Sequence, residues 1–188
     1  MTSLEALLNE GENFVRRLTA KDQLDAIEEQ LRASMVPIDI TDPKAFAKAC
    51  TGPGIYYIDA KFPFYNFARL EEFGDRWGRP RQANVPANTS RYYTARAKKH
   101  QLKIANGDFI PFYLGKEQNV QKRLNCHTNG LADSTTFSLK LNTRPEVVRG
   151  IEFRFGCAAI PVSDDAYFCV ALLEKALRER MHPIVGRQ

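Results

Sequence analysis

The amino-acid sequence predicts an α/β (α+β) fold, in which a small three-stranded sheet is flanked by helices and preceded by a helical extension. Three observations support this class. Apolar residues recur at helical spacing in the first third of the chain, three β-rich runs follow within residues 53–161, and glycine or proline marks the boundaries between them. With 188 residues, the chain can form one ordinary domain with an appendage.

The first third of the chain is predicted to be helical. Its apolar residues recur at a spacing close to one helical turn, first in residues 4–18 and again in residues 24–31. We expect these two stretches to form an amphipathic helical hairpin, which offers a surface for homodimerisation. Asp42-Pro43 then provides an N-cap and a first-turn proline for a short helix over residues 44–50.

Residues 51–188 are expected to form the main domain, after an N-terminal extension of residues 1–50. The predicted order of its elements is strand, strand, helix, strand, helix. The strands are predicted at residues 54–58, 109–114 and 151–161, and the helices are predicted to begin near Glu117 and at Asp164. A rigid scaffold can aim polar residues at the ends of such elements into a cleft, so the functional site is expected there.

Residues 61–107 separate the first two predicted strands and form a large basic insertion. The insertion holds ten Lys or Arg and three Asp or Glu, a net charge of +7, whereas residues 1–50 have a net charge of −3 and the whole chain +5. Such segregated charge predicts that the insertion lies along a polyanion or extends into solvent. The residues predicted to contact nucleic acid are Arg76, Arg79, Arg81, Arg91, Arg96, Lys98 and Lys99.

Aromatic residues are interleaved with these basic residues. Within the insertion, residues 90–102 are predicted to form a basic helix. Trp77, Tyr92 and Tyr93 either stack on bases or form a small local core, and the local core is the interpretation we favour.

The composition argues against several classes of protein. No apolar run approaches the roughly 18–20 residues that a membrane span requires, and the acidic start of the chain lacks the features of a signal peptide, so we expect a cytoplasmic protein without a membrane partner. The cysteines, Cys50, Cys126, Cys157 and Cys169, are scattered and form no C-x-x-C pair. Neither a zinc site nor a disulfide framework is therefore expected.

Two short motifs lie on the first two predicted strands. Gly54-Ile55-Tyr56 belongs to the first strand, and Tyr113-Leu114-Gly115 ends the second. This pair resembles the two signatures that name the GIY-YIG nuclease superfamily. With its N-terminal helical arm and large insertion, the chain looks more like a restriction-type or phage-defence endonuclease of that superfamily than a domain of a repair enzyme. Tyr57-Ile58 is rejected as the second motif, because that motif should end a separate strand and precede a helix.

Residues on two predicted helices extend the resemblance. Arg123 and His127 are four positions apart and therefore share one face of the helix after the second strand. The resembled family has an arginine on this helix, and some restriction-type members have a histidine one turn later. Glu174 lies among apolar residues of the last long helix, where the family has a metal-binding glutamate. A buried carboxylate is costly unless it is paired or bound to a metal, which gives Glu174 a physical reason to be there.

The resemblance implies a Mg²⁺-dependent endonuclease that hydrolyses phosphodiester bonds in DNA, with RNA left open as a substrate. Glu174 would bind one Mg²⁺, or Mn²⁺ in its place, and Arg123 would donate to the phosphate. Tyr113 and His127 would hydrogen-bond the attacking water or the phosphate. The general base is either Tyr56, whose pKa must then fall, or Lys116. We expect Lys116, Arg123 and the metal to lower the pKa of Tyr56.

The chain departs from the family pattern in two ways. Its two motifs are separated by more than fifty residues, so that residues 61–107 must be an excursion from the core. Members commonly have an asparagine after the proline that follows the glutamate helix, but only Arg187 or Gln188 could replace it here. The alternative function is therefore a catalytically weakened GIY-YIG domain that serves as a nucleic-acid-binding module.

Overall fold

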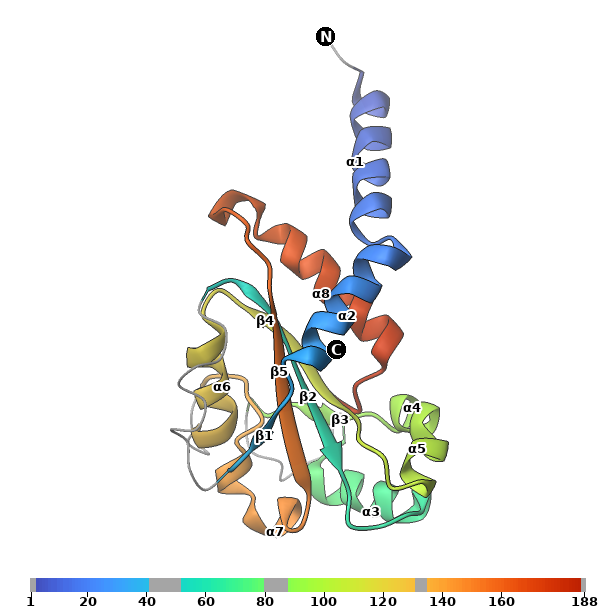
Figure 1. Ribbon diagram of the computed structural model, residues 1–188, viewed down its shortest axis with the longest axis vertical. Coiled ribbons are helices and arrows are strands. Elements are labelled where there is room, and N and C mark those ends of the chain that lie inside the picture. The colour runs from blue at the N-terminus through green and yellow to red at the C-terminus, as the bar shows by residue number, and fades with distance from the viewer. Residues whose placement is uncertain (1–2, 41–51, 80–87, 131–134, 187–188) are drawn as a thin grey trace.

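A four-stranded antiparallel sheet lies at the centre of the computed structural model, which describes residues 3–40, 52–79, 88–130 and 135–186 (Figure 1). The strand order is β1-β5-β2-β4. The strands are β1 (Val36–Ile38), β2 (Gly54–Lys61), β4 (Ile110–Glu117) and β5 (Glu152–Ala159). The last three were predicted, but the expected three-stranded sheet is wrong by one strand, because β1 adds an edge strand beside β5. Pro37 is tolerated there, since an edge strand leaves one row of N–H groups unpaired.

Helices cover both faces of the sheet. The helices are α1 (Leu4–Leu18), α2 (Lys21–Ala33), α3 (Phe67–Trp77), α4 (Thr94–Ala97), α5 (Gln101–Ala105), α6 (Val120–Asn129), α7 (Pro145–Val148) and α8 (Phe168–Met181). Single 3₁₀ turns lie at Lys98–His100, Leu141–Thr143 and Asp164–Ala166. The last of these turns explains why α8 begins after Asp164. None of the described helices is long and apolar enough to span a membrane.

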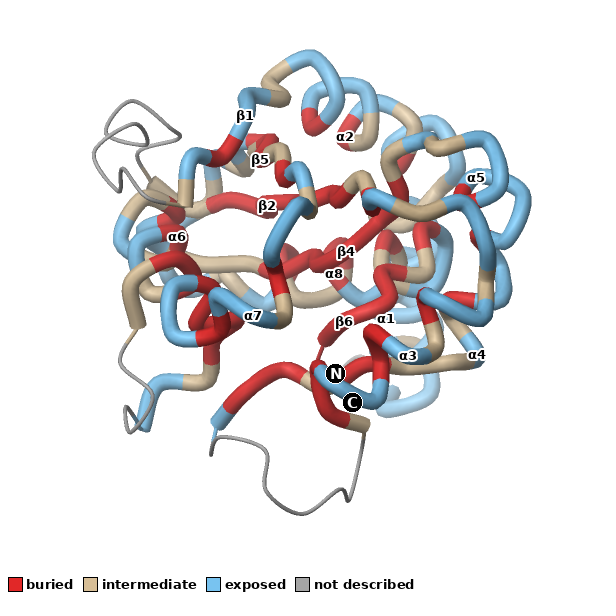
Figure 2. The backbone as a smooth tube through the Cα atoms, turned by 90° about the horizontal axis from the view of Figure 1, so that it is seen from below, coloured by how far each residue is buried: buried red, intermediate tan, exposed pale blue. Residues whose placement is uncertain are grey.

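Alternation along β2 divides the core into two apolar clusters. Ile55 and Tyr57 point to the face that α2 and α8 cover, and Tyr56 and Ile58 point to the face that α3 and α6 cover. Figure 2 shows β2 and β4 as buried strands in the middle of the molecule, with exposed residues on the surrounding helices. The sheet is therefore buried on both faces, and neighbouring residues of β2 meet different surroundings.

The N-terminal helices are present as predicted, but they do not form a hairpin. Figure 1 shows α1 standing out from the body of the protein. It continues into α2 end to end, with a bend between the two helices. The apolar stripe of α2 is buried in the cluster with α8, and Leu18 at the end of α1 packs against the same cluster. No residue of α1 is buried. The helix predicted at residues 44–50 lies outside the described residues.

The basic insertion is part of the core and not an excursion from it. Residues 90–102 were predicted to be one helix but begin instead with a short strand, β3 (Arg91–Tyr92), which pairs with the C-terminal strand β6 (Val185–Gly186). Trp77 and Tyr92 are fully buried, which confirms the predicted local core for these two residues. The Trp77 ring packs edge-on against Phe112 of β4, at 5.2 Å between ring centroids.

Candidate active site

The two motif tyrosines lie next to each other on one face of the sheet. The ring centroids of Tyr56 and Tyr113 are 6.0 Å apart, and their planes are inclined by 23°. In the β2–β4 register, Tyr56 is opposite Gly115. A Cβ atom at Gly115 would lie 2.5 Å from the Tyr56 hydroxyl oxygen, closer than real contacts allow. The glycine of the second motif therefore makes room for the tyrosine of the first.

Helix α6 brings an arginine and a histidine to the same hydroxyl. The helix begins directly after β4, where the Asn119 side chain accepts a hydrogen bond from the Lys122 amide. His127 Nε2 lies 2.8 Å from the Tyr56 hydroxyl oxygen, and Arg123 Nε donates to this oxygen at 3.4 Å. Four of the residues predicted for the site are thus brought together, namely Tyr56, Tyr113, Arg123 and His127.

Hydrogen bonds assign the proton of His127. The amide of Leu139 donates to Nδ1 at 3.0 Å, so Nδ1 carries a lone pair. Burial first, and then Arg123, lowers the pKa of His127 well below its usual value, so that the ring is neutral. The proton of a neutral ring with an accepting Nδ1 is on Nε2. His127 therefore donates to the Tyr56 oxygen, which receives a second N–H bond from Arg123.

The pKa of Tyr56 shifts in the opposite direction from the one we predicted. Burial first, and then Tyr113, raises it well above the usual value, and the nearby Arg123 only partly opposes this shift. The phenol is 1% exposed, so its anionic form loses almost all contact with water. The predicted fall in pKa is corrected, since burial outweighs the single cation that reaches the hydroxyl.

Lys116 is not part of this cluster. The alternation along β4 places Lys116 opposite Ile55, on the face of the sheet that α8 covers. Its ammonium nitrogen lies 4.6 Å from the ring centroid of Tyr167. The expectation that Lys116 lies near Tyr56 and lowers its pKa is therefore wrong, because the two side chains leave opposite faces of the sheet.

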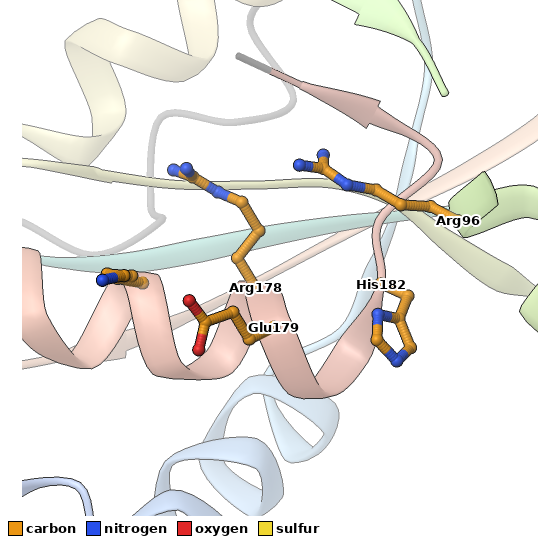
Figure 3. A pocket seen from close by; sticks show the side chains of 5 residues that line it. Arg96, Arg178, Glu179 and His182 are labelled. Carbon is orange, nitrogen blue, oxygen red and sulfur yellow. The ribbon is translucent and has the colours of Figure 1, made fainter. Parts of the chain in front are cut away.

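Glu174 lies on α8, across the sheet from Tyr56. It is 8% exposed, and its carboxylate forms an ion pair with Arg178 one turn later. The neighbouring cavity, of about 490 Å³, is lined by Arg96, Lys175, Arg178, Glu179 and His182. Figure 3 shows the guanidinium groups of Arg96 and Arg178 on the same side of α8. The surroundings of Glu174 are therefore predominantly basic.

Metal-ligating side chains were sought among the described residues. No group of three or more His, Cys, Asp or Glu side chains suitable for a metal ion occurs in the described part of the chain. A single carboxylate such as Glu174 still suits Mg²⁺, which usually keeps several waters and binds substrate phosphates. Arg178 already pairs with this carboxylate and would compete with the ion.

A second carboxylate, which the sequence analysis did not select, lies beside the tyrosine cluster. Glu117 Oε2 is 3.9 Å from Arg123 Nε. Both residues line a cavity of about 330 Å³ at the junction of β4 and α6, with Gln118, Asn119, Lys122, Cys126 and Thr136. Glu117 could have been predicted as a site residue from the sequence, because it follows the glycine of the second motif by only two positions. This cavity gives the Arg123 end of the cluster access to solvent.

The residues predicted to contact nucleic acid have different surroundings. Arg79 is paired with Glu71 and Asp75 within the insertion, and Arg76 donates to the carbonyl of Glu146. Arg96 lies over the ring of Tyr93, 4.4 Å from its centroid. Lys98 and Lys99 are exposed, and Arg91 is half-buried. Arg81, Arg187 and Gln188 lie outside the described residues.

The chain was compared with known proteins at the level of sequence and of structure. No family model, curated protein or solved structure matches it.

Proposed function

We propose that the protein is a Mg²⁺-dependent endonuclease that hydrolyses phosphodiester bonds in DNA, of the restriction or phage-defence type. One observation carries the proposal: Tyr56, Tyr113, Arg123 and His127 share one buried cluster, although they come from two strands and a helix. Their types and order agree with the GIY-YIG resemblance, in which some restriction-type members have the histidine. Gly115 explains physically why the two motifs occur together.

The cluster can perform two parts of phosphodiester hydrolysis. Arg123 extends from the tyrosines to the open cavity at Glu117, so its guanidinium can donate to a non-bridging phosphate oxygen while it still contacts Tyr56. Tyr56 can accept a proton from the attacking water only after it has lost its own. Two N–H donors, from His127 and Arg123, favour the resulting phenolate, whereas burial disfavours it.

Glu174 is the residue that we propose as the Mg²⁺ ligand. A bound Mg²⁺ would neutralise charge on the scissile phosphate, which requires that the substrate reaches the α8 face of the sheet as well as Arg123 on the opposite face. Helix α8 keeps the Glu174 carboxylate buried, and Arg178 compensates its charge. This ion pair lets the protein fold with a buried carboxylate before any metal ion is bound.

Digestion of a mixed-sequence plasmid tests the proposal. With Mg²⁺, the protein should nick or cut the plasmid, and EDTA should stop the reaction. Glu174→Ala should lose cleavage but keep its affinity for DNA, because the metal ligand and the surface arginines are separate. Glu117→Gln is the control, because it removes the charge of the carboxylate beside the tyrosine cluster and leaves Glu174 in place. It should cleave much faster than Glu174→Ala. Full activity of Glu174→Ala would refute the assigned ligand, and the absence of any cleavage would refute the nuclease.

The alternative, a binding module with weakened catalysis, is favoured by one observation. Glu174 is ion-paired and lies across the sheet from Tyr56 and Tyr113. For this alternative, the wild-type protein should bind a DNA duplex equally well with Mg²⁺ and with EDTA, and should leave the plasmid intact. The same digestion therefore separates the two functions.

A further inference from the structure

A group of buried polar residues lies beside His127, outside the tyrosine cluster. Residues 88–91 run along residues 137–139 there: the amide of Ser138 donates to the carbonyl of Asn88 at 3.0 Å, and the amide of Ser90 is 3.4 Å from the carbonyl of Ser138. Arg144 joins them, because its Nη1 donates to the carbonyl of Trp77 at 2.8 Å and the Trp77 indole donates to the carbonyl of Ser90. We call Ser90, Arg91, Ser138 and Arg144 the arginine–serine cluster.

The side chains of this cluster are poorly satisfied. Within the described residues, the hydroxyls of Ser90 and Ser138 and the Nη1 atom of Arg91 are buried without a hydrogen-bond partner. Both serines are 0% exposed. A buried polar atom without a partner is destabilising and is rare in native proteins, so several in one place call for an explanation.

The two arginines of the arginine–serine cluster add to the destabilisation, because their charges are buried or half-buried. Arg144 is 7% exposed, and its guanidinium carbon lies 4.5 Å from the ring centroid of Trp77. Burial first, and then the charge of Arg91, lowers the pKa of Arg144 to about 10, so that it remains a cation at neutral pH. No ion pair among the described residues includes Arg91 or Arg144. Arg91 and Arg144 therefore repel each other with no carboxylate from the described part of the chain between them, and an anion would remove this repulsion.

We infer that the arginine–serine cluster binds an oxyanion, and that this oxyanion is a phosphate group of the nucleic acid. The planar guanidinium groups and the hydroxyls supply donors that match the several acceptor oxygens of a phosphate. The segment that carries Ser138 also reaches the tyrosine cluster, because Arg123 donates to the carbonyl of Phe137 and the Leu139 amide donates to His127. A phosphate held here would lie next to the proposed catalytic residues. The identification as a nucleic-acid phosphate rests on the proposed function, whereas the oxyanion site does not.

Thermal unfolding with inorganic phosphate tests the oxyanion site. At constant ionic strength, with chloride as the reference salt, phosphate should raise the Tm of the wild-type protein in a saturable way. Arg91→Met should lose this response, and its Tm in chloride should equal or exceed that of the wild type, because an uncompensated buried charge has been removed. Arg149→Met, at an exposed position paired with Glu146, is the matched control and should respond like the wild type. A saturable response that survives in Arg91→Met, or no response in the wild type, would overturn the site.

Duplex binding in EDTA tests the identity of the oxyanion. Arg91→Met should bind a short DNA duplex about tenfold more weakly than the wild type, as expected for the loss of one charge-assisted hydrogen bond. An unchanged affinity for DNA, with the phosphate response lost, would assign the site to free phosphate and refute the nucleic-acid phosphate. Because EDTA prevents metal-dependent cleavage, a weaker duplex affinity supports the site even if the plasmid assay refutes the nuclease.

A second inference comes from α1, which belongs neither to the tyrosine cluster nor to the arginine–serine cluster. This 15-residue helix stands out from the body and has no buried residue, and its middle position is Gly11. Its C-terminal half touches the body, because the Phe14 ring lies 6.2 Å from that of Phe168 on α8 and Leu18 packs against the cluster of α2 and α8. An isolated helix of this length is marginally stable in water, and a central glycine weakens it further. Its exposed apolar residues include Leu4 at 73% and Leu8 at 60%. A partner that covers Leu4, Leu7 and Leu8 would therefore stabilise the half of the helix that this chain leaves uncovered.

The stripe is symmetric about Gly11. Its apolar residues lie three, four and seven positions before and after the glycine, as the pairs Leu8 and Phe14, Leu7 and Val15, and Leu4 and Leu18. One pair of opposite charges has the same spacing, because Glu5 and Arg17 lie six positions on either side of Gly11, whereas Glu10 and Glu12 flank the glycine with like charges. The space next to Gly11 is open, with nothing within 4 Å of a Cβ atom placed there.

We propose that α1 pairs with α1 of a second copy of this chain, antiparallel and with the two-fold axis at Gly11. Antiparallel pairing places Leu8 against the partner's Phe14 and Glu5 against the partner's Arg17, as an isologous interface requires. The two glycines would let the helices approach closely where they cross. This proposal is independent of the nuclease activity.

Sedimentation of the full chain tests the pairing. The wild type should be a dimer, and Glu5→Arg should weaken it because like charges then face each other. The double variant Glu5→Arg with Arg17→Glu should restore the dimer, which a merely unfolded helix would not do. Gly11→Leu should favour the helix itself and yet weaken the dimer by blocking the crossing. A monomeric wild type, or a dimer unaffected by Glu5→Arg and Gly11→Leu, would overturn the proposal.

Discussion

Tyr56 and Tyr57 are consecutive tyrosines of the same strand, and they show what distinguishes the candidate site from the rest of the core. Both are almost fully buried, at 1% and 2% exposure, and burial is the largest cause of a raised pKa in both. The Tyr56 hydroxyl receives hydrogen bonds from His127 and Arg123, whereas Tyr57 lies in the apolar cluster with α2 and α8. The charged neighbours of Tyr57, namely Asp59, Arg32, Arg154 and Glu28, act on it through their charge. Burial alone therefore does not mark a site. Hydrogen bonds that another element brings to a buried group do.

The largest effect that we expect is on the cleavage rate, and it should differ between variants of these two tyrosines. Tyr56→Phe should slow plasmid cleavage by about 10²- to 10⁴-fold, the usual contribution of a general base. Tyr57→Phe should cleave at a rate near that of the wild type, because its hydroxyl does not belong to the cluster. Initial rates in Mg²⁺, with circular dichroism to confirm folding of both variants, provide the measurement. Equal losses in the two variants would mean that Tyr56 has only a structural role.

The raised pKa of Tyr56 predicts a second, smaller effect, on the pH dependence of the rate. Only the phenolate can accept a proton from water, and burial makes the phenolate scarce at neutral pH. The cleavage rate should therefore rise about tenfold per pH unit from pH 7 upwards, as long as the pH stays below the pKa of Tyr56. The residual activity of Tyr56→Phe should lack this rise. A rate that is flat between pH 7 and pH 9 in the wild type would exclude Tyr56 as the base that titrates.

A third prediction concerns stability and the contact between the two motifs, in which Gly115 of the second motif faces Tyr56 of the first. Gly115→Ala places a methyl group against the Tyr56 hydroxyl, so the ring must move. Overpacking of this kind costs about 1–3 kcal/mol in the free energy of unfolding. Urea denaturation measures the loss, and the cleavage rate should fall as well because Tyr56 leaves His127. An unchanged stability would mean that the space above Gly115 is not needed.

The sequence predicted those parts of the molecule that local patterns determine. Strands β2, β4 and β5 and helices α6 and α8 carry apolar periodicity and clear boundaries, and the spacing of Arg123 and His127 correctly placed both on one helix face. Periodicity shows that a face is apolar, but not what covers it. The arrangement of α1 and α2 was therefore predicted wrongly.

Other features could not be predicted because they depend on contacts between distant residues. Strand β1 has only three residues and contains Pro37, so its pattern is too short to be recognised without β5. Strand β3 forms because it meets β6 at the other end of the chain. The pKa of Tyr56 was mispredicted because the charged neighbours were counted along the sequence, while burial by the whole fold is the larger cause.

The smallest expected effect concerns Lys116, which the sequence alone left open as a second general base. Lys116 and Tyr56 leave opposite faces of the sheet, and the Lys116 ammonium group lies over the ring of Tyr167. Lys116→Met should therefore leave the cleavage rate near that of the wild type, and should change stability by at most the roughly 0.5–1 kcal/mol of an exposed cation–π contact. Rates and urea midpoints measured beside those of Tyr56→Phe provide the test. A loss of cleavage as large as that of Tyr56→Phe, at unchanged stability, would move the proton acceptor from the tyrosine cluster to the opposite face of the sheet, where Glu174 also lies.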